Sequence, residues 1–312
     1  HPSDLNNNTE PARVTASRVL VLVYDPIMEW TTGRKLSEQQ DWQRVEDLAS
    51  GFMRDISAAS GGFARYQIAQ RIDLSEFPAS TDGFRHTPQS YMEVLRGMAP
   101  PHVPREADYV SVLKRFRILE RVARKEIDEV WIFAFPQAGF YGSTMGGPGA
   151  FWCNAPPLRN TDASLRRFVV MGFSVERNVG DMLEAFGHRA ESIMQKVYSP
   201  LSGEENLWNR FARYDMAAPG QAAVGTVHFA PNSRRDYEWE NASPVMSECY
   251  DWLNNFPDFK NDIRPVEAQE WGGGAARLHH QWWLNHIPRR PGRRNGILHN
   301  WWPYIIDPDR AP

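Results

Sequence analysis

The 312-residue sequence is poor in cysteine, with only Cys153 and Cys249. Two cysteines cannot build a framework of several disulfides, so the fold must rely on a buried core, for which a chain of this length is sufficient. The pair could form one disulfide or remain two separate buried thiols, and the sequence leaves both open.

The sequence also lacks a long apolar run and a strong net charge. No run approaches the roughly 18 residues of a membrane span, so we expect a soluble protein. The net charge is −3, and no nucleic-acid-binding motif is present, so we expect no nucleic-acid partner. Neither G-x-x-x-x-G-K-[ST] nor G-x-G-x-x-G occurs, which disfavours a nucleotide site.

What is present is a globular composition with 12 Trp residues. The chain starts at His1, without Met, and residues 1–17 form a polar leader that we interpret as a mature end left after export.

Apolar runs predict strands at 18–24, 65–74, 129–135 and 168–175, and helical periodicity predicts helices at 39–59, 109–125 and 179–197. This alternation predicts an α/β fold with a parallel-sheet core (flavodoxin/Rossmann-like) over 18–200, and the loop-rich, Trp-rich region 201–312 is expected to pack on it as a cap.

Polar groups follow three predicted strands, at the edge where parallel sheets bind ligands. Asp25 follows the first strand, and Glu176 and Arg177 follow the fourth. We expect Asp25 and Glu176 to lie on one edge as acid and base, with Arg177 holding a substrate oxygen. Asp25 could instead begin a turn, and Glu176 could interact with a helix dipole.

The glycine-rich loop 136–149 follows the third predicted strand and brings Gln137, Tyr141 and Ser143 to the same edge as candidate substrate-binding residues. The surroundings of Ser143 do not match G-x-S-x-G, and no positioned base is evident, so a serine nucleophile is disfavoured.

Glu184, His188 and Glu191 share one face of the helix predicted at 179–197, opposite its apolar stripe. The favoured interpretation is an ordinary solvent face. The alternative is a divalent metal, Zn or Ca, held by Glu184 and His188 with a third ligand from His228, His279 or His280.

The C-terminal region is crowded with tryptophan, and flat aromatic rings suit sugar faces. At least one ring of this set is expected to line the same cleft as the strand-end carboxylates: Trp271, Trp282, Trp283, Trp301 and Trp302. In each adjacent Trp pair we expect one ring inside and one nearer the surface. The alternative is that these tryptophans form a core.

Four phrases carry a resemblance to a known group: "IDEVWIFAFPQAGFYGSTMGGPGAFWCNAPP", "GFSVERNVGDMLEAFGHRAES", "VHFAPNS" and "WWLNHIPRRPG…GILHNWW". Together they resemble a family of secreted bacterial proteins of hypothetical function. The resemblance covers most of residues 19–304 and implies export and one shared architecture. It implies no activity and assigns no site residue.

Three functional hypotheses remain. The first is a secreted hydrolase acting on a carbohydrate polymer or glycoconjugate through the strand-end carboxylates. The second is a metal-dependent hydrolase using Glu184 and His188. The third is a carbohydrate-binding or surface protein without catalysis, in which the same aromatic side chains bind.

Overall fold

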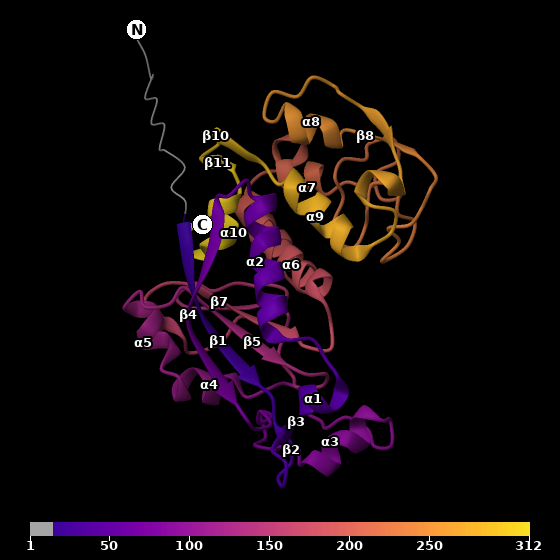
Figure 1. Ribbon diagram of the computed structural model, residues 1–312. Helices are drawn as coiled ribbons and strands as arrows, with labels where there is room; N and C mark the ends of the chain where they lie inside the picture. The colour runs from indigo at the N-terminus through magenta and orange to yellow at the C-terminus, as the bar shows by residue number, and fades with distance from the viewer. Residues whose placement is uncertain (1–14) are drawn as a thin grey trace. The chain divides into compact units, whose positions relative to one another are not determined.

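The computed structural model describes residues 15–312, which divide into two compact units. The sheet unit comprises Ser17–Asp55, Tyr66–Lys196 and Asp307–Pro312, and the Trp-rich unit comprises Ile56–Arg65 and Val197–Ile306, with residues 15 and 16. Figure 1 labels the elements of both units, and each unit is described by itself. The second unit begins near the expected boundary at residue 201, but the last residues of the chain belong to the sheet unit. Residues 1–14 of the expected leader lie outside the described residues, and β1 begins at Thr15.

The core of the sheet unit is a five-stranded sheet in the order β4-β1-β5-β7-β6. The strands are β1 (Thr15–Tyr24), β4 (Ala64–Leu74), β5 (Glu129–Ala134), β6 (Thr144–Gly146) and β7 (Phe168–Ser174). β5 pairs in parallel with both β1 and β7, and β6 is an antiparallel edge strand. When the four longer strands are numbered along the chain, their order across the sheet is 2-1-3-4, which is the order of flavodoxin-like sheets. The predicted α/β class is confirmed.

Side chains alternate between the two faces of this sheet. On one face, residues such as Leu20, Ile132 and Val170 belong to a core that includes residues of α4 (Tyr109–Arg115) and α5 (Ile118–Ala123). On the other face, Phe52 of α2 (Val45–Ala59) has its ring centroid 5.2 Å from that of Trp131 and 5.9 Å from that of Phe186 of α6 (Val179–Tyr198). The sheet is therefore covered on both sides, as its continuous apolar runs predict.

Two predicted helices are interrupted in the structure. The helix expected at 39–59 begins earlier, as α1 (Leu36–Gln40), and continues after a break as α2. The helix expected at 109–125 is divided into α4 and α5. Each break contains a residue with left-handed backbone, Asp41 at φ 52° and Arg117 at φ 51°, a conformation that ends an α-helix. The other elements of the sheet unit are β2 (Ile27–Glu29), β3 (Arg34–Lys35), α3 (Pro88–Leu95), η1 (Asp162–Ser164) and η4 (Pro308–Arg310).

The Trp-rich unit is built from short elements around an aromatic core. Phe211 is central, with ring centroids of Trp252, Trp283 and Trp301 at 5.2, 5.8 and 5.4 Å. Such edge-to-face contacts add to the burial of large apolar areas. Its elements are η2 (Gly203–Glu205), α7 (Leu207–Phe211), β8 (Val245–Ser247), α8 (Cys249–Asn254), β9 (Arg264–Val266), η3 (Ala268–Trp271), α9 (Ala276–His286), β10 (Arg289–Arg294), β11 (Ile297–Asn300) and α10 (Trp302–Ile306).

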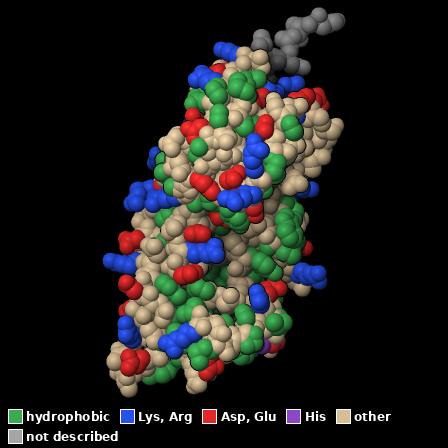
Figure 2. Space-filling view, turned by 90° about the vertical axis from the view of Figure 1, so that its right-hand side faces the viewer, with side chains coloured by type: hydrophobic (Ala, Val, Ile, Leu, Met, Phe, Trp, Pro, Cys, Tyr) green, Lys and Arg blue, Asp and Glu red, His purple; other side chains and the backbone are tan. Residues whose placement is uncertain are grey.

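Cys153 and Cys249 are free and buried, so of the two possibilities the structure has separate thiols. Burial raises the pKa of the Cys153 thiol to about 11, which disfavours the reactive thiolate. No helix among residues 15–312 has the length and apolarity needed to cross a membrane. Figure 2 shows basic and acidic side chains interspersed on one face, as the small net charge leads one to expect.

Mild acid should destabilise the Trp-rich unit. Burial lowers the pKa of His286 from 6.5 to about 4, with a smaller contribution from Arg289. The pKa of His279 is also lowered well below 6.5, by burial and by His280, His286 and His228. Since the folded state disfavours these protons, the stability is fully present above pH 6.5 and is lost as the pH falls toward 4. His286 should remove about 1.4 kcal/mol per pH unit in that window, and His279 acts in the same direction.

Urea denaturation at several pH values between 7.5 and 5.0 measures this slope. His286→Gln retains a donor for the carbonyl of Trp282, which accepts from His286 Nδ1 at 2.7 Å, but removes the titrating group. The free energy of unfolding of this variant should fall less steeply with decreasing pH, by about 1.4 kcal/mol per unit. An identical slope in wild type and variant would contradict the assignment.

Candidate functional site

A crevice of about 320 Å³ lies in the sheet unit, beyond the carboxyl ends of β5 and β7 and beside the first half of α6. This is the edge at which open parallel sheets bind ligands. Its volume lies in the range of small-ligand sites. The polar residues that line it are Gln137, Asn154, Ser174, Arg177, Asn178, Asp181, Glu184 and His188.

Two of the lining amides have unusual backbone conformations. Gln137 has φ 66° and Asn154 has φ 56°, both in the left-handed region that few side chains other than glycine adopt readily. Asn154 is also tied to α6, because its N–H donates to Ser192 Oγ at 3.0 Å. Strained residues of this kind persist where the surrounding structure holds them, and they cluster at functional sites. The backbone at both lining residues is thus set by the fold before any ligand arrives.

The glycine-rich loop after β5 approaches the sheet closely, as its composition predicts. The N–H of Gly172 in β7 donates to Tyr141 O at 2.9 Å, and a Cβ at Gly172 would lie 2.5 Å from that oxygen. Next to it, Ser174 Oγ is buried and has no hydrogen-bond partner among the described residues. A buried hydroxyl without a partner is costly, so a ligand that bonds to it would be favoured.

The start of α6 is fixed by its own side chains. Asn178 Oδ1 accepts from the N–H of Gly180 at 2.7 Å, and Asp181 Oδ2 accepts from the N–H of Asn178 at 3.3 Å. Arg177 Nη1 donates to Asp181 Oδ1 at 3.2 Å. This reciprocal capping satisfies backbone N–H groups at the helix start and fixes where α6 begins, beside the crevice.

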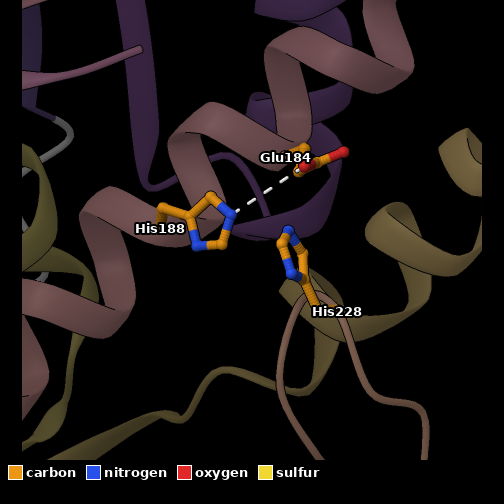
Figure 3. Close-up of side chains that lie close together, drawn as sticks. All are labelled: Glu184, His188 and His228. Atoms are coloured by element: carbon orange, nitrogen blue, oxygen red, sulfur yellow. Dashed lines mark ion pairs between the residues drawn. The ribbon is translucent and has the colours of Figure 1, made fainter. Parts of the chain in front are cut away.

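About two helical turns after Asp181, His188 lies between two carboxylates. Its Nδ1 is 3.1 Å from Glu191 Oε2. Its Nε2 is 3.9 Å from Glu184 Oε1, and Figure 3 marks this pair by a dashed line. All three side chains are about one-fifth exposed, at 23, 22 and 20%. The shared helix face expected from the sequence is therefore present, but it is mostly covered, and two of its members, Glu184 and His188, line the crevice.

The other candidate metal ligands belong to the Trp-rich unit, and the placement of the two units relative to each other is not determined. His228 Nδ1 lies 3.0 Å from Asp236 Oδ1. His279 is fully buried, with its Nδ1 3.1 Å from His280 Nδ1 and its ring 5.5 Å from that of Trp239. His279 is thus a histidine of the core, and a ligand set that joins these residues to α6 stays a prediction.

The strand-end carboxylates lie on one edge, since β1 and β7 both pair in parallel with β5, but neither lines the crevice. Both oxygens of Asp25 are engaged, accepting from Ser37 N–H at 3.0 Å and from Ser37 Oγ at 2.6 Å. Glu176 is exposed. The expected acid–base pair is therefore corrected: Asp25 secures the first turn of α1, and of the three predicted catalytic residues only Arg177 reaches the crevice.

The predicted loop residues also differ in their roles. Gln137 lines the crevice. Ser143 is buried and donates to Cys153 O at 3.1 Å, so it is not a surface residue for substrate. Tyr141 is partly buried and donates its N–H to Tyr109 Oη at 2.8 Å, which holds the loop against α4.

Most of the C-terminal tryptophans form a core, which is the alternative interpretation, and the expectation that one of them lines the cleft stays a prediction because the two units are not placed relative to each other. Four of the five are at most 1% exposed and form core: Trp271, Trp283, Trp301 and Trp302. Only Trp282 is partly exposed, so the expected division into an inner and an outer ring holds for one pair alone. Trp301 and Trp302 can both point inward because the backbone changes there from β11 to α10.

Sequence reasoning missed Trp152, which is 59% exposed and lies two residues before Asn154. Only Trp30, at 77%, is more exposed among the tryptophans. The signal that could have found Trp152 is its position in a loop of glycine and proline after a buried strand, where side chains surround the ligand edge. No family model, curated protein or solved structure matches this chain.

Asp25 should matter for stability. Asp25→Ala removes two hydrogen bonds to a charged acceptor and should lower the free energy of unfolding by about 2 kcal/mol. Glu176→Ala changes an exposed carboxylate at the same edge and should alter it by less than about 0.5 kcal/mol. Urea denaturation of both variants checks this, and equal effects would show that the contacts of Asp25 do not stabilise α1.

Proposed function

We propose that the protein is a metal-dependent hydrolase that acts on a carbohydrate polymer or glycoconjugate in the crevice beyond β5 and β7. The observation that supports this most is the position of His188 between Glu191 and Glu184. The hypothesis that Asp25 and Glu176 act as acid and base is given up, because neither residue lines the crevice.

The contact with Glu191 favours one form of the imidazole. At 3.1 Å, Nδ1–H can donate to the carboxylate, which leaves the lone pair on Nε2. Metal-binding histidines commonly donate their second ring N–H to a carboxylate in this way. Glu191 would then be a positioning residue, and Nε2 would be the ligand atom.

Nε2 and Glu184 Oε1 carry lone pairs and lie 3.9 Å apart, too far for a hydrogen bond. Two atoms bound to one tetrahedral zinc, each at about 2.1 Å, are roughly 3.4 Å apart. A small rotation of either side chain would reach that separation. An imidazole nitrogen favours zinc over calcium, which takes six to eight oxygen ligands.

A catalytic zinc site needs a third protein ligand and keeps one position for water. α6 would supply two ligands, and His228, the candidate from the sequence, stays a prediction for the third. A bound zinc would lower the pKa of its water to near 7, so that hydroxide is available at neutral pH.

The walls of the crevice suit a substrate rich in hydroxyl groups. The amides of Gln137, Asn154 and Asn178 can each donate and accept, and Ser174 Oγ has no partner in the described part of the chain. Trp152 is not among the residues that line the crevice, but it is exposed and its Cα lies within about 7 Å of that of Asn154, so its ring is a candidate aromatic surface beside the crevice. Amides beside an exposed ring are well suited to sugars, whose rims are polar and whose faces are apolar.

Zinc binding should depend on α6. Purified protein equilibrated with zinc and then desalted should retain one equivalent by elemental analysis. His188→Ala should retain none, and Glu191→Gln should weaken zinc affinity about 10- to 100-fold, because it alters only the group that orients His188.

Glu176→Gln is the matched control, since it changes an exposed carboxylate outside the crevice and should bind zinc like wild type. Full zinc retention by His188→Ala, or no zinc in wild type, would exclude the site. His228→Ala tests the third ligand separately.

Trp152 should contribute to sugar binding. Calorimetric titration with hexaoses of β-1,4-linked N-acetylglucosamine, β-1,4-linked glucose and α-1,4-linked glucose should find at least one ligand. Trp152→Ala should weaken that binding by about 1–3 kcal/mol, the range of aromatic stacking on flat ligands. Trp30→Ala removes the more exposed Trp30, which does not line the crevice, and should leave sugar binding unchanged. Equal losses in both variants would contradict a specific role for Trp152.

A further inference from the structure

A strongly basic hairpin lies in the Trp-rich unit, and none of its residues lines the crevice of the sheet unit. It is formed by β10 and β11, with the sequence RRPGRR followed by Asn295-Gly296 and ILHN. All six residues of β10 are exposed, and four of them are arginines: Arg289, Arg290, Arg293 and Arg294. Because consecutive strand residues point to opposite faces, positive charge lies on both faces of this strand.

The hairpin is held in a defined conformation. Asn295 and Gly296 have φ of 52° and 78°, the positive values that a two-residue type I′ turn requires. β11 is fastened to α10, because the N–H of Leu298 donates to Tyr304 Oη at 3.0 Å. At the base, Arg290 Nη2 donates to Asn254 O at 2.9 Å, and Arg289 Nη1 donates to Ala59 O. The basic side chains thus project from an ordered frame.

These charges are not neutralised within the described chain. Arg289 and Arg290 bond to backbone carbonyls, and Arg289 also to the amide of Asn285, none of which carries charge. Arg293 and Arg294 make no side-chain hydrogen bond or ion pair with residues 15–312. Arg235, an exposed arginine elsewhere in this unit, instead has carboxylate neighbours in Glu238 and Glu240, at 3.6 and 3.5 Å. Four like charges without counter-charges repel one another, and a polyanion would relieve that repulsion.

We propose that the β10–β11 hairpin binds an acidic polysaccharide, one that bears carboxylate or sulfate groups. The guanidinium fork suits such groups, since it binds planar carboxylates with two parallel hydrogen bonds. The hairpin has no exposed large hydrophobic side chain. Base stacking by a single-stranded nucleic acid would require an exposed aromatic ring, and insertion into a membrane surface would require an exposed apolar one. The hairpin can therefore bind a partner only through the positive charge and hydrogen bonds of its arginines. These features fit a flexible polyanion that is rich in hydroxyl groups.

The test measures binding of the full chain to heparin and to polygalacturonate by titration at 50 to 300 mM salt, with neutral dextran for comparison. Wild type should bind both acidic polysaccharides and not dextran. The double variant Arg293→Ala/Arg294→Ala should bind at least about 10-fold more weakly at 50 mM salt. The slope of log K against log salt should fall by roughly 2, about one unit for each lost ionic contact.

Arg234→Ala/Arg235→Ala is the matched control, because it removes the same charge from an adjacent exposed pair in the same unit and should bind like wild type. Thermal unfolding of each variant shows that the fold is kept. Single-stranded oligo(dT) and vesicles containing 30% phosphatidylserine are titrated in parallel. Tighter binding to either of these, equal losses in the two double variants, or no binding to the acidic polysaccharides would overturn the proposal. None of these outcomes depends on zinc or on the crevice.

Discussion

The sheet unit depends on one buried ion pair, between Arg189 of α6 and Glu129 at the start of β5. The guanidinium donates to both carboxylate oxygens, at 3.1 and 2.9 Å, and both side chains are almost completely buried. Trp131 Nε1 donates to the same carboxylate at 2.7 Å. Breaking such a pair leaves an uncompensated buried charge, which costs roughly 3–5 kcal/mol, so rotation of α6 about its axis is strongly opposed.

The fixed rotation of α6 decides which of its residues reach the crevice. With about 100° between consecutive residues, a helix that turns Arg189 toward β5 places His188 on its flank. Glu184 and Glu191 lie one turn before and one turn after it and share that flank. The loops after β5 and β6 supply the facing wall, where Gln137 and Asn154 are held in left-handed backbone. The site therefore combines a helix of fixed rotation with loop residues of defined backbone conformation.

The main strands and the spacing of side chains on α6 can be predicted from local sequence patterns, whereas contacts between distant segments cannot. Apolar runs and helical spacing predict the four main strands, and the i, i+4, i+7 spacing predicts the contacts of His188, because helix geometry alone sets them. The role of Asp25 could not be predicted, since it depends on Ser37 arriving twelve residues later at the end of β1. Burial of the tryptophans is likewise a tertiary property. Trp152 and Trp301 both lie in sequences rich in tryptophan, glycine or asparagine, yet one is 59% exposed and the other 0%.

The two units use different physical means to stay folded. The sheet unit buries aliphatic runs on both faces of parallel strands, whereas the Trp-rich unit has short strands and helices and few long apolar runs. Large rings compensate, since one tryptophan buries about 150–250 Å² and packs edge-to-face with several neighbours. Histidines fill the remaining gaps in this core, as His279 does against Trp239. A neutral imidazole packs well there, but in the unfolded chain the same histidine binds a proton near pH 6.5. Acid therefore favours the unfolded chain, and the packing that stabilises this unit also makes it sensitive to acid.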